Sequence, residues 1–175
     1  MMKTIYLTLL LVALTSTASF AASTNRLHFP AAGFSIAPLD SPPTQTPQQV
    51  IVMTLTPTDG FSGNVNVQIQ PYAGTLAEYV TLSLEQFKAG KLTVLDQRTL
   101  SKSVAIIEYT GKLQGRSLHW YARLELFNGN IYLATATSLE TQWTKESSQL
   151  KACIDSLRCD KVGAGPASKP NAKDQ

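Results

Sequence analysis

The feature that most constrains the fold is segment 116–137, where two runs of β-favouring residues are joined by Asn128-Gly129. Side chains in the first run alternate between a fully apolar set and a largely polar set. The apolar set is Leu118, Trp120, Ala122, Leu124 and Leu126, and the other set is His119, Tyr121, Arg123, Glu125 and Phe127. Asn-Gly favours the positive φ angles of a tight turn between right-twisted strands. The segment therefore predicts a hairpin in the middle of an antiparallel sheet.

The start of the 175-residue chain has the pattern of a secretory signal peptide. A basic start at Lys3 precedes an apolar run from Ile5 to Leu14, and Ser19 and Ala21 fit the −3 and −1 positions of a cleavage site. The apolar run is about half of the ~20 residues that a membrane-spanning helix needs, which disfavours the alternative of an uncleaved anchor. We therefore expect residues 1–21 to be removed and the product to be periplasmic or secreted, without membrane insertion.

The residues after the signal peptide predict one domain that combines strands with two helices. Short strands are expected around residues 27–36, followed by longer strands at 50–56, 64–70, 93–100 and 103–113. We expect one domain over residues 22–159. The tail 160–175 has one valine and no aromatic residue, and we expect it to be disordered because it has little apolar surface to bury.

Two segments have apolar residues at helical spacing. In residues 75–91 the apolar residues are Leu76, Val80, Leu84 and Phe87, and in the last segment they are Trp143, Leu150, Ile154 and Leu157. Thr75 and Glu78 match a capping box at the start of the first helix, and Gly90 is a plausible stop. We expect Trp143 to anchor the second helix in the core. The order of elements predicts an α+β fold with a twisted antiparallel sheet.

Several segments also resemble known proteins in their order and spacing. They are Gly33-Phe34-Ser35-Ile36-Ala37-Pro38, Glu108-Tyr109-Thr110-Gly111, Tyr132-Leu133-Ala134-Thr135-Ala136-Thr137, Trp143, and Ile154-Asp155-Ser156-Leu157. With these residues the chain resembles the PsbP-like family and its exported bacterial DcrB-like relatives, over roughly residues 27–158. The resemblance implies a twisted antiparallel sheet sandwiched by two main helices, the PsbP-like α/β/α sandwich.

The residues that usually carry catalysis or bind nucleic acid are sparse. The formal net charge is +3, and the lysines and arginines are scattered, so we expect no nucleic-acid partner. The two histidines, His28 and His119, are far apart in sequence, and no serine lies in a G-x-S-x-G motif. We therefore expect neither an enzyme nor a metal site, and no cofactor.

Two functions from different classes remain open. The first is an exported accessory protein that docks on an envelope partner through a polar row on one strand, with a second, amide-rich face on another. The row is His119, Tyr121, Arg123 and Glu125, and the amide-rich face is Asn64, Asn66, Gln68 and Gln70. The alternative is a carrier of a small molecule or metal ion, with a pocket between the sheet and one helix lined by Trp120, Tyr121 and Trp143. A cavity of ~300 Å³ or more with convergent polar groups would favour the carrier.

The two cysteines, Cys153 and Cys159, predict a disulfide if the chain is exported to an oxidising compartment. Six residues along an unbroken helix would leave the two Cβ atoms roughly 10 Å apart, against the ~4 Å that a disulfide needs. The helix must therefore end near Ser156 or Leu157 for this bond to form.

Overall fold

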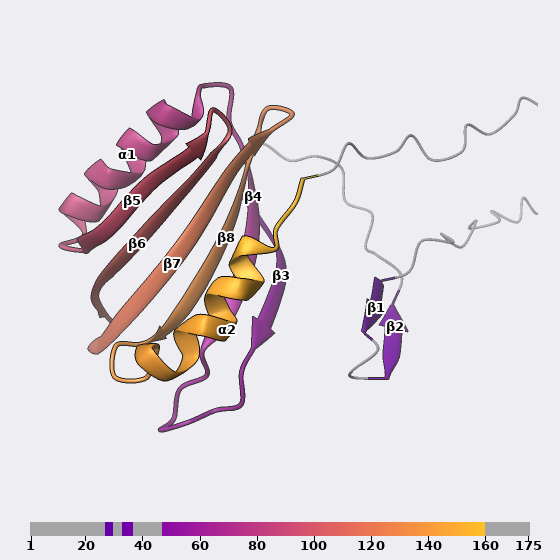
Figure 1. Cartoon of the computed structure of the whole chain (residues 1–175), viewed down its shortest axis with the longest axis vertical. Helices are drawn as coiled ribbons and strands as arrows, with labels where there is room; N and C mark the ends of the chain where they lie inside the picture. Colours follow the sequence, from indigo (N-terminus) through magenta and orange to yellow (C-terminus); the bar gives the residue numbers. More distant parts are fainter. Residues whose placement is uncertain (1–26, 30–32, 37–46, 160–175) are drawn as a thin grey trace, which may run out of the picture. The chain divides into compact units, whose positions relative to one another are not determined.

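The computed structural model describes residues 27–29, 33–36 and 47–159 (Figure 1). Its elements are β1 (Leu27–Phe29), β2 (Phe34–Ile36), β3 (Gln48–Thr54), β4 (Asn64–Pro71), α1 (Leu76–Ala89), β5 (Thr93–Ser101), β6 (Val104–Leu113), β7 (Arg116–Phe127), β8 (Asn130–Leu139) and α2 (Trp143–Asp155). The predicted signal peptide and the predicted disordered tail lie outside the described residues.

The short strands β1 and β2 form a two-stranded antiparallel sheet of their own, as the sequence predicts. His28 is paired with Ser35 across this hairpin, and Gly33 adopts a φ of 73° immediately before β2. A positive φ is readily accessible to glycine, which lacks the Cβ atom that disfavours this conformation in other residues.

The other six strands form one antiparallel sheet in the order β3-β4-β8-β7-β6-β5. The β7–β8 hairpin lies at its centre, which confirms the prediction from the sequence. Asn128 and Gly129 have φ angles of 48° and 71°, as the tight turn requires. Strands β3 and β5 form the two edges of this sheet.

The two helices pack on opposite faces of the sheet (Figure 1). Strand β7 shows this by alternation: Ala122 and Leu124 belong to a buried cluster with Leu76 and Val80 of α1. Tyr121, one residue before Ala122, faces the other side of the sheet and belongs to a second cluster with Trp143, Leu150 and Ile154 of α2. The fold is therefore α+β, with one core on each side of an antiparallel sheet.

Local signals in the sequence place the start and end of α1. The Thr75 side chain accepts a hydrogen bond from the Glu78 N–H, and the Glu78 carboxylate accepts one from the Thr75 N–H at 2.7 Å. These backbone and hydroxyl contacts with Thr75 lower the pKa of Glu78. Gly90 follows as the C-cap, so the predicted capping box and stop are both confirmed.

Helix α2 is held by an apolar stripe and ends where the predicted disulfide requires. Trp143, Leu150 and Ile154 are buried against the sheet, which confirms the expected anchor. The helix ends at Asp155, with Ser156 as its C-cap.

Among the described residues, none of the helices has the length and apolar character needed to cross a membrane.

Buried polar row and candidate ligand pocket

The polar row predicted to bind a partner is buried, so this prediction is wrong. His119, Tyr121 and Arg123 are only 4%, 3% and 9% exposed, and the Glu125 side chain is 14% exposed. These residues occupy the face of β7 on which α2 packs, and α2 and neighbouring strands supply their polar partners. The row contributes to the structure of the core and is not an exposed docking surface.

His119 lies at the centre of the buried network. Its Nε2 atom is 2.8 Å from Oε1 of Glu108, and its Nδ1 atom is 3.0 Å from Oε2 of Glu140. A neutral imidazole has a single N–H, so only the doubly protonated ring can donate to both carboxylates. The ring also stacks on Trp143, with 3.9 Å between centroids and 13° between planes. His119 thereby links β6, β7 and the start of α2.

Glu108 joins this network to the middle of α2. Its Oε2 atom accepts a hydrogen bond from Nζ of Lys151 at 2.8 Å. Burial disfavours the charged form of Glu108, but the contacts with Lys151 and His119 outweigh it, so the pKa of Glu108 is lowered. Glu108 and Glu140 thus lie on either side of the His119 ring, and Lys151 supplies a cationic partner to the buried Glu108.

Tyr121 links the sheet to the end of α2. Its hydroxyl donates to Oδ1 of Asp155 at 3.0 Å, and the Arg98 guanidinium lies 3.5 Å from the same hydroxyl. Burial, followed by the nearby Asp155 carboxylate, raises the pKa of Tyr121 to about 12. The hydroxyl therefore remains a protonated donor at neutral pH.

Arg123 and Glu125 form an ion pair at the far end of the row. Nη2 of Arg123 is 3.2 Å from Oε2 of Glu125, and Glu125 also accepts a hydrogen bond from the Cys159 N–H at 3.3 Å. Nε of Arg123 is buried and has no hydrogen-bond partner among the described residues. Cys153 and Cys159 are not joined to each other in the structure, so the Cys153–Cys159 disulfide stays a prediction.

The amide-rich face of β4 lies on the α1 side of the sheet and is half-buried. The Tyr79 hydroxyl of α1 donates to Oε1 of Gln70 at 2.5 Å, and Gln70 in turn donates to Oε1 of Gln68. Burial raises the pKa of Tyr79. The inner part of this face is therefore occupied by contacts with α1, whereas Asn64 and Asn66 lie beyond them along the strand.

The predicted pocket lined by Trp120, Tyr121 and Trp143 does not exist, because these side chains lie on different faces. Tyr121 and Trp143 share the α2 cluster. Trp120 is next to Tyr121 in β7 and therefore points to the opposite face of the sheet. There its ring stacks on Tyr109, with centroids 5.1 Å apart. Tyr109 stacks in turn on Phe87 of α1, and burial raises its pKa to about 12. Trp120 thus belongs to an aromatic series on the α1 side.

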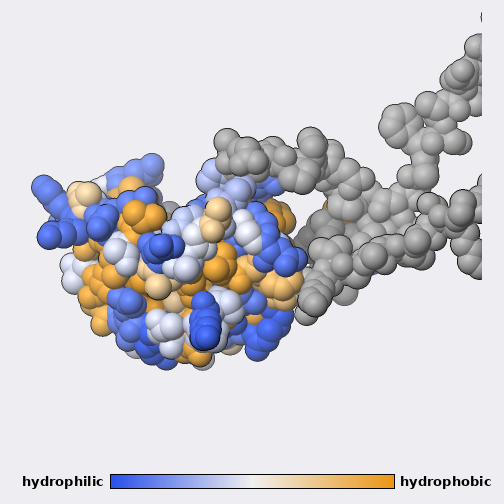
Figure 2. All heavy atoms as spheres, turned by 90° about the horizontal axis from the view of Figure 1, so that it is seen from above, coloured by the Kyte–Doolittle hydropathy of each residue, from blue (hydrophilic) through white to orange (hydrophobic). Residues whose placement is uncertain are grey.

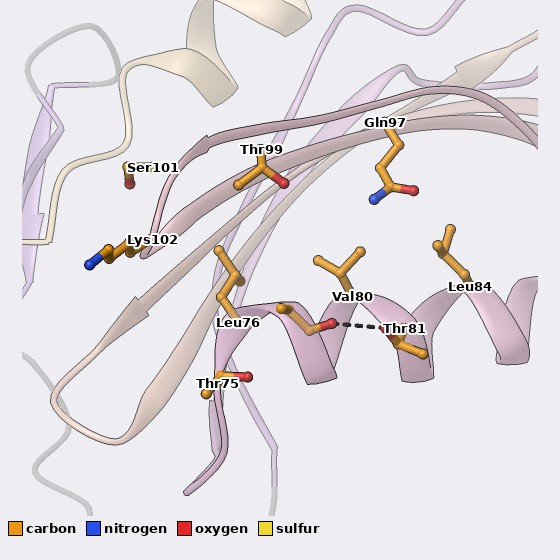
Figure 3. A pocket seen from close by; sticks show the side chains of 10 residues that line it. Thr75, Leu76, Val80, Thr81, Leu84, Gln97, Thr99, Ser101 and Lys102 are labelled. Carbon is orange, nitrogen blue, oxygen red and sulfur yellow. Dashed lines mark hydrogen bonds between the residues drawn. The ribbon is translucent and has the colours of Figure 1, made fainter.

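A cavity of about 530 Å³ does lie between the sheet and a helix, at a different place, between α1 and the edge strand β5 (Figure 3). Leu76, Val80 and Leu84 point from α1 toward the strand and form an apolar wall. Gln97 and Thr99 point from β5 toward the helix and form a polar wall. The cavity therefore has the size and mixed lining of a small-molecule site.

Three polar residues lie at one end of this cavity. Thr75, at the start of α1, and Ser101 and Lys102, at the β5–β6 turn, belong to its lining. The Ser101 hydroxyl lies 3.3 Å from the Ser103 hydroxyl. Within the described part of the chain, the side chains of Gln97, Thr99 and Lys102 have no hydrogen-bond or ion-pair partner. The polar wall can therefore bind a ligand without first losing internal contacts.

The cavity arises from a mismatch between α1 and the strand beside it. Gln97 and Thr99 are paired with Ile107 and Ala105 of β6, so they lie on the α1 face. The extra residues at the two register shifts of β5 are Leu95 and Leu100, both 53% exposed. Leu95 and Leu100 therefore do not fill the space under α1, and the short side chain of Ala105 leaves further room.

A smaller cavity, of about 250 Å³, lies at the other flank of α1. Its lining includes Tyr72, Tyr79, Phe87 and Tyr109, but Gln70 and Ser83 there already have internal hydrogen bonds. Figure 2 shows hydrophilic and hydrophobic residues interspersed over the face seen from above. The α1–β5 cavity is about twice as large, and its polar wall has no such internal contacts among the described residues, which makes it the stronger candidate of the two.

The residues needed for a metal carrier are not brought together. Among residues 27–29, 33–36 and 47–159, the structure contains no group of three or more His, Cys, Asp or Glu side chains placed to hold a metal ion. The metal-ion form of the carrier hypothesis therefore gains no support from the described residues, whereas the small-molecule form gains a cavity.

The sequence did not identify the site residues Gln97, Thr99, Ser101 and Lys102. The segment Thr93–Ser101 contains three exposed apolar residues, Val94, Leu95 and Leu100, and its two register shifts disturb the alternation that would have located its faces. A usable signal was the polar pair Gln97 and Thr99 at alternate positions of a strand that follows an amphipathic helix.

Comparisons with known proteins give the fold and no family. No family model matches the chain, and no curated protein matches it by sequence. The structure is similar to the crystal structure of a Pseudomonas aeruginosa protein of unknown function, with a TM-score of 0.59, 12% identity, and coverage of 79% of this chain and 98% of that one. It is also similar to the solution structure of cyanobacterial PsbP from Synechocystis sp. PCC 6803, with a TM-score of 0.44, 10% identity, and coverage of 71% and 99%.

Proposed function

We propose that the protein is an exported, non-enzymatic binding protein of the cell envelope, and that it holds a small molecule with an apolar side in the α1–β5 cavity. The observation that carries this proposal is a cavity of about 530 Å³ with an apolar helix wall facing a polar strand wall. Residues 1–21 support export. We assign the fold to the PsbP-like α/β/α sandwich, which the helices on opposite faces support.

The chemistry of the lining favours binding over turnover. Lys102 is the single ionisable side chain among the ten lining residues, which otherwise carry hydroxyl, amide or apolar groups. General acid–base catalysis needs a group that exchanges protons near neutral pH, such as His, Asp or Glu in a tuned environment. The lining offers shape, apolar surface and hydrogen-bonding groups, which suffice for capture and release.

The test is to fill the cavity from its exposed strand. Thr99→Tyr places a large side chain in the cavity from an exposed position of β5, and Thr93→Tyr, on the same edge strand outside the lining, is the matched control. We expect a neutral apolar dye, N-phenylnaphthylamine, to gain fluorescence with the wild type and with Thr93→Tyr. Thr99→Tyr should weaken dye binding at least about tenfold, because it occupies the volume that the dye needs. Equal binding by all three proteins would reject the α1–β5 site.

A second candidate function, docking on an envelope protein partner, is favoured by the edge strand β3. Its side chains Val52 and Met53 are 49% and 42% exposed, and its pairing with β4 is regular from Ile51 to Thr54, beyond the register shift at Val50. An exposed edge with apolar side chains can pair with an added strand of another protein. This edge replaces the buried row of β7 as the surface for that hypothesis.

Crosslinking in cell envelopes tests this second function. Val50→Lys together with Val52→Lys should remove a crosslinked species seen with the wild type, because charges on the edge oppose strand addition. Leu113→Lys, which changes another exposed apolar residue, should keep that species. Retention of the species by the β3 variant would exclude docking through this edge.

A further inference from the structure

We infer that the α1–β5 cavity selects an anionic amphiphile, such as a linear alkyl carboxylate, with its head group at the Lys102 end. This inference rests on the proposed small-molecule function and adds the charge and polarity of the ligand. It follows from three features of the cavity: the charge of its lining, the orientation of α1, and the distribution of apolar residues along it.

The lining has a net positive charge because Lys102 is its only charged residue. Among the described residues, Lys102 forms no ion pair. Figure 3 shows its side chain extending outward from the β5–β6 turn, at the end of the cavity where α1 begins. Its long flexible stem can turn over the cavity mouth, so the ammonium group can meet a head group without a backbone change.

The start of α1 favours a negative head group at the same end. Leu76 and Ala77 line the cavity and belong to the first turn, whose N–H groups lack carbonyl partners within the helix. The helix dipole adds partial positive charge there. Glu78 is the acidic residue of this turn. Its carboxylate accepts hydrogen bonds from the Thr75 N–H at 2.7 Å and from the Thr75 hydroxyl at 2.9 Å.

The apolar part of the ligand should extend away from this end along α1. Leu76, Val80 and Leu84 follow one another at helical spacing on the cavity wall, and Gln97 to Ser101 run alongside on β5. The four steps from Gln97 to Ser101 span roughly 13 Å of strand. An elongated chain with a polar end therefore matches the lining better than a compact ring system.

The edge strand itself argues against an extended peptide as the occupant. A peptide that added to β5 would need a regular row of backbone donors and acceptors. The register shifts that place Leu95 and Leu100 as extra residues interrupt this row at two points. Such bulges disturb edge pairing and protect sheets from strand addition.

The experiment compares three ligands that share one alkyl chain and differ in head group. Decanoate, decanol and decyltrimethylammonium would each displace N-phenylnaphthylamine from the wild type, Lys102→Met and Lys112→Met. Lys112 is an exposed lysine of β6 outside the lining and is the matched control. Melting temperatures would confirm that each variant is folded.

We expect the wild type and Lys112→Met to bind decanoate about fivefold more tightly than decanol, and decyltrimethylammonium most weakly. Lys102→Met should reduce the preference for decanoate, and high salt should reduce it in the wild type. Equal affinity for decanoate and decanol would overturn the anionic inference while leaving the proposed small-molecule function intact. A preference unchanged in Lys102→Met would overturn the assignment of Lys102. If neither the dye nor any of the three ligands binds, the proposed function itself is rejected.

Discussion

The two faces of the sheet carry helices of similar length, 14 residues in α1 and 13 in α2, but their interfaces are filled differently. Under α2, polar side chains meet polar partners: His119 lies between Glu108 and Glu140, and Tyr121 donates to Asp155. Under α1, the polar side chains of β5 face an apolar wall across a cavity. Polar residues on a strand therefore do not by themselves identify a binding site. Polar groups that face a cavity are the better indication.

The largest expected effect comes from comparing a buried residue of α2 with a half-buried residue in the wall of the α1–β5 cavity. Trp143→Ala removes a side chain that is 8% exposed and stacks on His119, and should destabilise the fold by roughly 3 kcal/mol. Leu84→Ala, in the wall of the α1–β5 cavity, should lower the free energy of unfolding clearly less, because that side chain is only half-buried. Urea denaturation measures both. Equal losses would mean that α1 is packed as tightly as α2.

The next effect concerns the end of α2. Oxidation of Cys153 and Cys159 to a disulfide should stabilise the exported protein by about 2 kcal/mol, since it closes a short loop. The helix ends at Asp155, so Cys159 lies outside it and the helix does not hold the two cysteines apart. Intact-mass measurement with and without thiol alkylation detects the bond, and Cys153→Ser is the control. Two alkylated thiols in the exported protein would refute this prediction.

The smallest effect is a pH dependence confined to the α2 side. Because the pKa of Glu108 is lower in the folded state, its ionised form stabilises the protein above the unfolded pKa of about 4.3. This stabilisation is lost as the pH falls through the folded pKa. Between pH 7 and pH 3, the free energy of unfolding of Glu108→Gln should therefore fall by roughly 1 kcal/mol less than that of the wild type.

Unfolding midpoints across this pH range test the prediction, with Glu85→Gln as a control on α1. Glu85 is exposed and, among the described residues, its side chain forms no ion pair or hydrogen bond, so its substitution changes a carboxylate without removing a contact between a helix and the sheet. A Glu108→Gln profile that falls as steeply as that of the wild type would show that this carboxylate does not couple α2 to the sheet.

Local sequence patterns predicted the parts of the fold that depend on neighbouring residues. Asn128-Gly129 predicted the central turn, Thr75 and Glu78 the helix cap, and the position of Trp143 its burial. Alternation along β7 correctly grouped the residues of its two faces. It could not show what covers each face, because that depends on packing between elements far apart in sequence.

The buried network under α2 and the candidate site under α1 were both beyond prediction for the same physical reason. Glu108, Glu140 and Lys151 come from three separate segments, so their convergence on the His119 network depends on the register of the whole sheet. The cavity depends on which face of β5 lies under α1, and the bulges in β5 obscure this. Sequence did predict that a sheet–helix cavity would decide between the two functions, but not its place.

The most direct test of the contrast between the two faces is a residue-resolved NMR titration with decanoate. Backbone amide shifts should change for Leu76, Val80 and Thr99, which line the α1–β5 cavity, and stay constant for His119 and Tyr121 beneath α2. Saturable changes confined to the cavity residues are the predicted result. Changes centred on the α2 side, or none on either side, would contradict the assignment of the binding site to α1 and β5.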